Sequence, residues 1–146
     1  MKLNEAFYCV DNERRVTRHG RRRIEQVDDV PTRYLALLLE ADPEALSVDT
    51  GSDGVSVRDG SGATTRTVGE WPSRAALVAD VAAFVALGER LPAFEELEGP
   101  QRDELVARLR VFLEACPTCD GELIEESDGD GMMPAISCGE CGAALF

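Results

Sequence analysis

The sequence has almost no lysine and almost no histidine. Lys2 is the only lysine among 15 basic residues, and His19 is the only histidine in the 146-residue chain. With so few of these residues, the sequence offers no supported set of side chains for catalysis by a Ser-His pair, a Cys-His pair or a lysine amine. A phosphate-cradling loop with Gly-Lys-Thr or Gly-Lys-Ser is also missing. The sequence therefore predicts a protein that is not an enzyme.

Long apolar runs are also absent. The longest stretch almost free of charge, residues 75–88, is interrupted by Asp80 and is too short to span a bilayer. Residues 1–10 lack the basic start and apolar run of a leader sequence. We therefore expect a cytoplasmic protein with no membrane partner, in a compartment where thiols stay reduced.

Acidic side chains outnumber basic ones by 28 to 15, which gives a formal net charge of −13. An acid excess with arginine in place of lysine resembles the composition of proteins from salt-accumulating haloarchaea. The resemblance implies a halophilic, archaeal protein whose negative charge keeps it soluble when salt screens repulsion. An acidic mesophilic protein from a GC-rich genome is the alternative explanation.

Four of the five cysteines form two Cys-x-x-Cys pairs near the end of the chain. Cys116 is paired with Cys119 and Cys138 with Cys141, and 18 residues separate the pairs. Each turn of this kind presents two sulfurs to one ion, and the spacing is typical of a four-thiolate zinc site. The fifth cysteine, Cys9, stands among apolar residues and is interpreted as a core residue.

The cysteine pattern resembles the zinc-ribbon family over about residues 113–146. The resemblance implies an all-β ribbon around one Zn²⁺, and we expect its strands at residues 122–126 and 132–137, with a third short strand at 143–146. Four thiolates close the coordination shell and leave no position for a catalytic water, so the zinc would be structural. Iron is the alternative, because such turns also resemble rubredoxin; rubredoxins surround the metal with aromatic rings, whereas this segment has only Phe146.

Three glycines lie beside the cysteines. Gly121, Gly139 and Gly142 fit the tight turns that follow metal-binding cysteines, where a positive φ is often needed. Residues 116–146 also contain seven acidic side chains and no lysine or arginine. Because a polyanion would be repelled by such a surface, we expect this segment to contact a protein partner and not nucleic acid.

Residues 5–27 predict a small β-meander that carries a dense arginine patch. The patch consists of Arg14, Arg15, Arg18, Arg21, Arg22 and Arg23. Guanidinium groups fork onto phosphate or carboxylate, so one hypothesis is a surface that binds RNA, DNA or an acidic protein. The alternative is that the patch pairs with the acidic body of the protein itself or solvates an edge strand.

Helices and one hairpin are expected between the meander and the cysteines. Apolar periodicity and capping residues predict helices over residues 32–41, 73–87, 92–98 and 101–115, with a short helical turn at 43–46. Strands are expected at 54–58 and 64–68. Inward-facing Leu105, Leu109, Phe112 and Leu113 are expected on the last helix. The predicted fold class is α+β, with an α+β domain over 1–113 and a zinc ribbon over 114–146.

The predicted helix at 73–87 is apolar nearly all round. Such a helix is either central to the fold or part of a subunit interface, and here a homodimer through this helix is the alternative to central burial.

Residues 48–52 read Val-Asp-Thr-Gly-Ser, which resembles the catalytic loop of aspartic proteases. The resemblance implies Asp49 as the base. It covers five residues only, and the run Asp-Thr-Gly-Ser-Asp-Gly is also an ordinary loop sequence. The leading hypothesis is thus a non-enzymatic zinc-ribbon adaptor that contacts another protein, RNA or DNA binding through the arginine patch is second, and a hydrolase of this type is a remote alternative.

Overall fold

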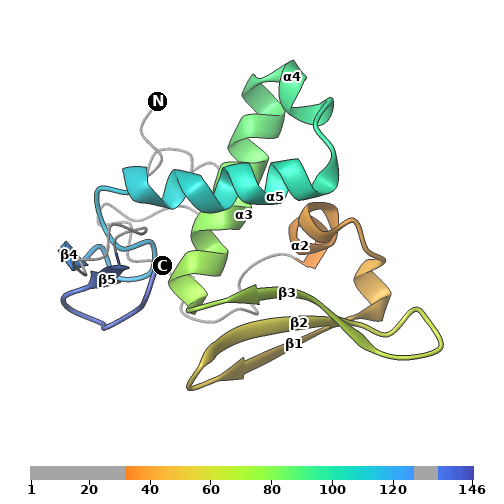
Figure 1. Cartoon of the computed structure of the whole chain (residues 1–146), viewed down its shortest axis with the longest axis horizontal. Helices are drawn as coiled ribbons and strands as arrows, with labels where there is room; N and C mark the ends of the chain where they lie inside the picture. The colour runs from red at the N-terminus through yellow and green to blue at the C-terminus, as the bar shows by residue number, and fades with distance from the viewer. Residues whose placement is uncertain (1–31, 127–134) are drawn as a thin grey trace.

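The computed structural model describes residues 32–126 and 135–146. Helices lie against one face of a three-stranded antiparallel sheet, and a two-stranded sheet lies at the other end of the molecule (Figure 1). The mixed α+β class predicted from the sequence is confirmed. The predicted β-meander at 5–27, with Cys9 and the arginine patch, lies outside the described residues.

Helix α2, Thr32–Leu39, opens the described part of the chain. Its buried leucines, Leu35 and Leu38, are three positions apart and so share one face. A short 3₁₀ helix, η2 (Pro43–Ala45), follows, and the carboxylate of Asp42 caps it by accepting the N–H of Glu44 at 3.0 Å. This is the helical turn that the Asp-Pro-Glu sequence predicts.

The larger sheet contains β1 (Leu46–Gly51), β2 (Gly54–Asp59) and β3 (Arg66–Trp71) in that order, all antiparallel. The predicted hairpin between β2 and β3 is confirmed, and β3 extends further than expected, to Trp71. Val55 and Val57 of β2 are buried, as their alternation predicts.

Strand β1 was not expected, and the prediction of a loop after the helical turn was wrong there. Every residue of β1 after Leu46 is exposed, so the strand has no apolar alternation to reveal it. Backbone pairing with β2 holds the strand in place, from Leu46 opposite Asp59 to Gly51 opposite Gly54. The Asp-Thr-Gly sequence therefore forms the end of an edge strand.

Helix α3, Arg74–Arg90, is the centre of the fold and contacts α2, α4, α5, β2 and β3. Ten of its residues are buried, which confirms the expectation of central burial. Ser73 caps it by accepting the N–H of Ala76 at 3.1 Å. Among the described residues, no helix combines the length and apolarity needed to cross a membrane.

The predicted end of α3 at Leu87, with Gly88 as the residue that stops the helix, was wrong by about one turn. The helix continues to Arg90, and the N–H of Leu91 still bonds to the carbonyl of Leu87 at 2.8 Å. Leu91 then adopts an extended conformation because Pro92 disfavours a helical residue before it. A glycine within a packed helix was therefore a weaker stop signal than the proline beyond it.

Three short helical segments lead from α3 to the cysteines: α4 (Pro92–Glu95), α5 (Gly99–Arg108) and η3 (Leu109–Phe112). The helix predicted to reach residue 115 ends earlier, since Leu113 is extended. Phe112, expected to face inward, is 67% exposed, and Arg110 is buried instead. The tighter 3₁₀ turn of η3 rotates its side chains relative to an α-helix and exchanges the two positions.

The smaller sheet pairs β4 (Leu123–Glu126) with β5 (Ala135–Cys138), and Leu123 lies opposite Cys138. The predicted third strand is reduced to one bridge between Ser137 and Ala144. Buried residues of this end belong to the same apolar cluster as the helices; they are Cys116, Ile136, Cys138 and Leu145.

Candidate metal centre

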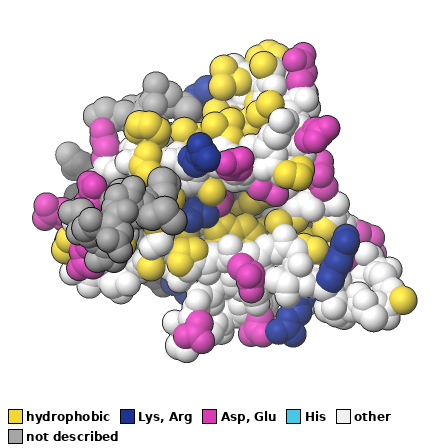
Figure 2. Space-filling model, in the orientation of Figure 1, with side chains coloured by type: hydrophobic (Ala, Val, Ile, Leu, Met, Phe, Trp, Pro, Cys, Tyr) yellow, Lys and Arg dark blue, Asp and Glu magenta, His cyan; other side chains and the backbone are white. Residues whose placement is uncertain are grey.

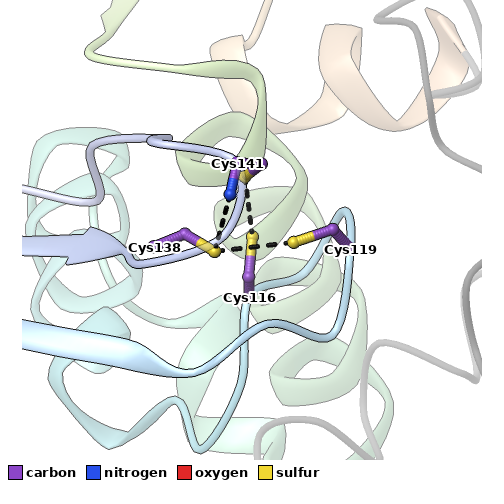
Figure 3. Close-up of side chains that lie close together, drawn as sticks. All are labelled: Cys116, Cys119, Cys138 and Cys141. Atoms are coloured by element: carbon purple, nitrogen blue, oxygen red, sulfur yellow. Dashed lines mark hydrogen bonds between the residues drawn. The ribbon is translucent and has the colours of Figure 1, made fainter.

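The fold brings together all four cysteines of the two Cys-x-x-Cys pairs. Their sulfur atoms lie within 4.8 Å of one another (Figure 3). Across the two pairs, Sγ of Cys116 is 3.7 Å from Sγ of Cys141, and Sγ of Cys119 is 3.5 Å from Sγ of Cys138. Within the described residues this is the group of metal-ligating side chains that can hold an ion.

The sulfur separations fit a tetrahedral ion. A metal–thiolate distance of about 2.3 Å places tetrahedral sulfurs about 3.8 Å apart, close to the observed separations of 3.5 and 3.7 Å. A disulfide would instead need about 2.05 Å between sulfurs, and the four cysteines are free thiols. An all-thiolate donor set suits zinc or iron and does not suit magnesium or calcium.

The turn of the first Cys-x-x-Cys pair, the first metal-binding turn of the candidate centre, spans residues 116–121 and is closed by backbone hydrogen bonds. Cys116 N–H donates to the carbonyl of Gly121, and Asp120 N–H donates to the carbonyl of Cys116, both at 2.9 Å. The positive φ of this turn is at Asp120, at 61°, and not at Gly121 as expected. Gly121 is needed for space, because a Cβ there would lie 2.8 Å from Sγ of Cys138.

The second metal-binding turn spans residues 138–143. Gly142 has φ of 73°, as predicted, and its N–H donates to the carbonyl of Cys138 at 3.0 Å. Gly139, predicted in the same way, does not have a positive φ and instead donates its N–H to the carbonyl of Glu122 at 2.9 Å. That bond ties the second turn to the start of β4, so the two pairs are held at a fixed separation.

The surroundings of the sulfurs shift their pKa values in different directions. Burial raises the pKa of Cys116 and that of Cys119, and hydrogen bonds with the other three cysteine side chains raise the pKa of Cys119 further. Burial also opposes ionisation of Cys138, but the N–H groups of Cys141 and Glu140, together with the side chains of Cys119 and Cys141, outweigh it and lower the pKa of Cys138 to about 7. A bound cation would favour the thiolate at every position, because only thiolates bind the metal.

Of the other predicted site residues that the structure describes, Asp49 is not part of this cluster. The arginine patch at 14–23 lies outside the described residues. Asp49 is on the exposed edge strand β1, where Arg58 lies 3.7 Å from its carboxylate. The described residues around Asp49 contribute no second Asp-Thr-Gly turn, so a hydrolase would need one from elsewhere.

A buried polar group near the cluster was missed in the sequence. Asp80 and Arg110 form an ion pair that is buried on both sides, and Trp71 donates its Nε1–H to Asp80 at 2.9 Å. A signal for it existed, because Asp80 is the one charged residue between positions 75 and 88. A carboxylate within an otherwise apolar stretch of helix requires a buried partner.

Comparison with known proteins identifies a family for this chain but finds no matching individual protein. No curated protein and no solved structure matches the chain. The central domain of a family of unknown function, DUF8054, matches residues 10–111. This match covers the helices and the larger sheet and stops five residues before Cys116. The chain therefore belongs to the DUF8054 family, with the four-cysteine cluster following its central domain.

Proposed function

We propose that the protein is a non-enzymatic adaptor whose C-terminal zinc ribbon, held by one structural Zn²⁺, presents a surface to another protein. The convergence of four cysteine sulfurs at tetrahedral separations carries this proposal. When four thiolates bind one zinc ion, the shell is closed and the metal contributes folding energy instead of activating water.

Metal analysis of the purified protein tests the first half of the proposal. We expect one equivalent of zinc per chain and, after exchange, a Co²⁺ spectrum typical of tetrahedral thiolate ligation. Cys138→Ser should lower the metal content, whereas Cys9→Ser, which removes the cysteine outside the cluster, should leave one equivalent. One equivalent of iron in place of zinc would identify the other metal, and a metal-free native protein would refute the site.

Exposed apolar side chains on either side of the first metal-binding turn form the proposed contact surface. Val111 and Phe112 precede the turn and Ile124 follows it, with exposed fractions of 39%, 67% and 47%. Several acidic side chains lie at this end of the molecule on the face shown in Figure 2. Exposed apolar groups within a charged rim are typical of protein-binding surfaces.

The charge of this surface defines the partner. Residues 116–146 carry no lysine or arginine, and one zinc with four thiolates adds a further charge of about −2. A complementary partner therefore has an apolar patch bordered by lysine or arginine side chains. The attraction between the opposite charges of the two partners would strengthen binding at low salt, and it would weaken as added salt screens the charges.

A matched pair of variants tests the contact. Phe112→Ser should abolish retention of a cross-linked protein partner from a nuclease-treated native lysate. Leu37→Ser removes an exposed apolar side chain elsewhere, on α2, where Leu37 is 59% exposed, and this variant should retain the same partner. Equal retention by the two variants, both with full metal content, would refute this surface.

RNA or DNA binding through the arginine patch is the second candidate function. The charge of the chain is split: residues 1–33 carry eight basic and six acidic side chains, whereas 34–146 carry seven basic and 22 acidic ones. Replacing Arg21, Arg22 and Arg23 by serine should abolish retention on nucleic acid and remove its salt dependence. Retention that is unchanged in this variant would dismiss the candidate.

A homodimer through α3 is a weaker proposal. Ten residues of α3 are already buried within one chain, which leaves the half-buried Phe84, Val85 and Leu87 as its remaining apolar contacts. A sedimentation measurement that gives a single monomeric species at micromolar concentration would refute it.

A further inference from the structure

Asp80 and Arg110 form a two-point ion pair in the interior. Nε of Arg110 donates to Oδ1 of Asp80 at 2.7 Å, and a terminal nitrogen donates to Oδ2 at 2.5 Å. The exposed fractions of the two residues are 4% for Asp80 and 8% for Arg110. Trp71 completes the arrangement by donating to the same carboxylate. The pair therefore joins the end of β3, the middle of α3 and η3.

The second terminal nitrogen of Arg110 reaches the C-terminal segment, residues 143–146. It donates to the carbonyl oxygen of Leu145 at 3.0 Å, and the Leu145 side chain is fully buried. The guanidinium also lies over the ring of Phe146, 5.5 Å from its centre. Ser73, the cap of α3, donates its hydroxyl to the carbonyl of Ala144. Core side chains thus bind the backbone of this segment at two successive residues.

The C-terminal segment in turn holds β5 and the second metal-binding turn. Leu145 N–H donates to the carbonyl of Ile136 at 2.7 Å, and Cys138 N–H donates to the carbonyl of Ala143 at 2.9 Å. A continuous set of contacts therefore runs from Trp71 through Asp80 and Arg110 to the backbone of a candidate metal ligand.

Stability alone does not explain why the two buried positions 80 and 110 hold a charged pair. Burying an ion pair costs desolvation, and an apolar pair of similar volume is often as stable. An apolar pair could not donate to the carbonyl of Leu145. A guanidinium can hold one carboxylate with two donors and still direct a third donor elsewhere, which lysine cannot do in this geometry.

We propose that Asp80 and Arg110 are positioning residues for the metal centre. They hold the C-terminal segment against β5 and so fix the turn that carries Cys138 and Cys141, and the same contacts transmit metal occupancy to the core around Trp71. This inference rests on the metal binding proposed above. Because such coupling is reciprocal, a change at the ion pair alters the affinity for the metal, and loss of the metal alters the core.

The chain offers a separate reporter for each end of this connection. Trp71 is the only tryptophan, so its fluorescence reports the core beside Asp80. Bound Co²⁺ absorbs through its thiolate ligands and reports the metal centre. The measurement is the rate of Co²⁺ loss to an excess of chelator, with Trp71 emission recorded in the same sample before and after loss.

We expect Arg110→Lys to release Co²⁺ about 10- to 100-fold faster than the wild type, because loss of a residue that orients metal ligands lowers metal affinity by about that factor. Chelation should shift Trp71 emission in the wild type and shift it less in the variant. Ser73→Ala should accelerate release to a smaller extent, and Ser73→Thr, which keeps the hydroxyl, should restore the wild-type rate.

Two controls separate positioning from general destabilisation. Phe94→Ala removes a buried side chain of α4 that packs on Phe84, and Arg108→Lys changes an exposed arginine that pairs with Glu104. Neither should accelerate metal release. If Phe94→Ala and Arg110→Lys release the metal equally fast, or if chelation leaves Trp71 emission of the wild type unchanged, the positioning role is refuted while the metal centre stands. A wild type that binds no Co²⁺ refutes the metal centre itself.

Discussion

The core, residues 32–112, and the metal module, residues 116–146, are stabilised in different ways. In the core, α3 alone buries ten residues against other helices and strands. In the described part of the module the buried apolar or sulfur-containing residues are Cys116, Pro117, Ile136, Cys138 and Leu145, and two of these are candidate metal ligands. The core can therefore fold by apolar burial, whereas the module needs either an ion or the core beside it.

The two regions also differ in charge, and the difference has a structural consequence. All the arginines of the described residues belong to the core, since residues 116–146 have none. At the junction the core supplies side-chain donors, from Ser73 and Arg110, and the module supplies backbone carbonyls as acceptors. The donor side chains of this contact thus belong to the core, and the module contributes the backbone carbonyl groups that accept the hydrogen bonds.

The largest expected effect comes from removing the ligands of the module. Cys138→Ser combined with Cys141→Ser should abolish metal binding, which contributes about 10–16 kcal/mol of apparent free energy in small zinc modules. Hydrogen exchange should then show loss of amide protection in β4 and β5, with protection of the middle of α3 largely retained. Full protection of β5 in this variant would mean that the module folds without metal.

Truncation of a core side chain should cost less but act on the whole protein. Leu77→Ala removes a fully buried side chain of α3 and should lower the free energy of unfolding by about 2–5 kcal/mol. Urea denaturation of the metal-loaded protein, followed by Trp71 fluorescence, measures the loss. Leu91→Ala, at a leucine that is 50% exposed, should change it by about 0.5 kcal/mol or less. Equal effects would contradict the described burial.

The same glycine-to-alanine change should act in opposite directions at two positions of the core. Gly54 has φ of 123°, and a Cβ there would lie 2.2 Å from the carbonyl oxygen of Trp71. Gly54→Ala should therefore destabilise the protein by about 1–3 kcal/mol. Gly88 lies in α3 with no atom within 4 Å of an added Cβ, so Gly88→Ala should stabilise by about 0.4–1 kcal/mol. Thermal unfolding of both variants measures whether each substitution lowers or raises the stability of the protein.

The smallest expected effect is a pH dependence at the β2–β3 hairpin. Hydrogen bonds from Ser61 lower the pKa of Asp59 below its ordinary value of 3.8, and Arg66 adds a smaller contribution. A lowered carboxyl pKa contributes stability above pH 3.8 that is lost as the pH falls through the folded-state pKa. The stability difference between wild type and Asp59→Asn should thus shrink in acid below that pH. In Arg66→Ser, an NMR titration should still find the pKa of Asp59 lowered.

Much of the core could be predicted because its signals are local. The cap at Ser73, the apolar sequence of α3 and the alternation of Val55 and Val57 each reflect an interaction with near neighbours in the chain. Strand β1 could not be predicted, because the pairing that forms it involves the backbone of β2 and leaves its side chains exposed. The inward position of Arg110 depends on the 3₁₀ geometry of η3, which an apolar pattern of α-helical period does not contain.

The sequence by itself determined that four cysteines stand in two pairs, that the segment around them has no cation, and that α3 must be buried. These features follow from residue type and spacing, which the chain carries in any conformation. Only the tertiary structure decided how the module is attached. Asp80, Arg110 and Leu145 are far apart in sequence. The hydrogen bonds that join them, and that offset the cost of removing the charges from water, form only when α3, η3 and the C-terminal segment lie together.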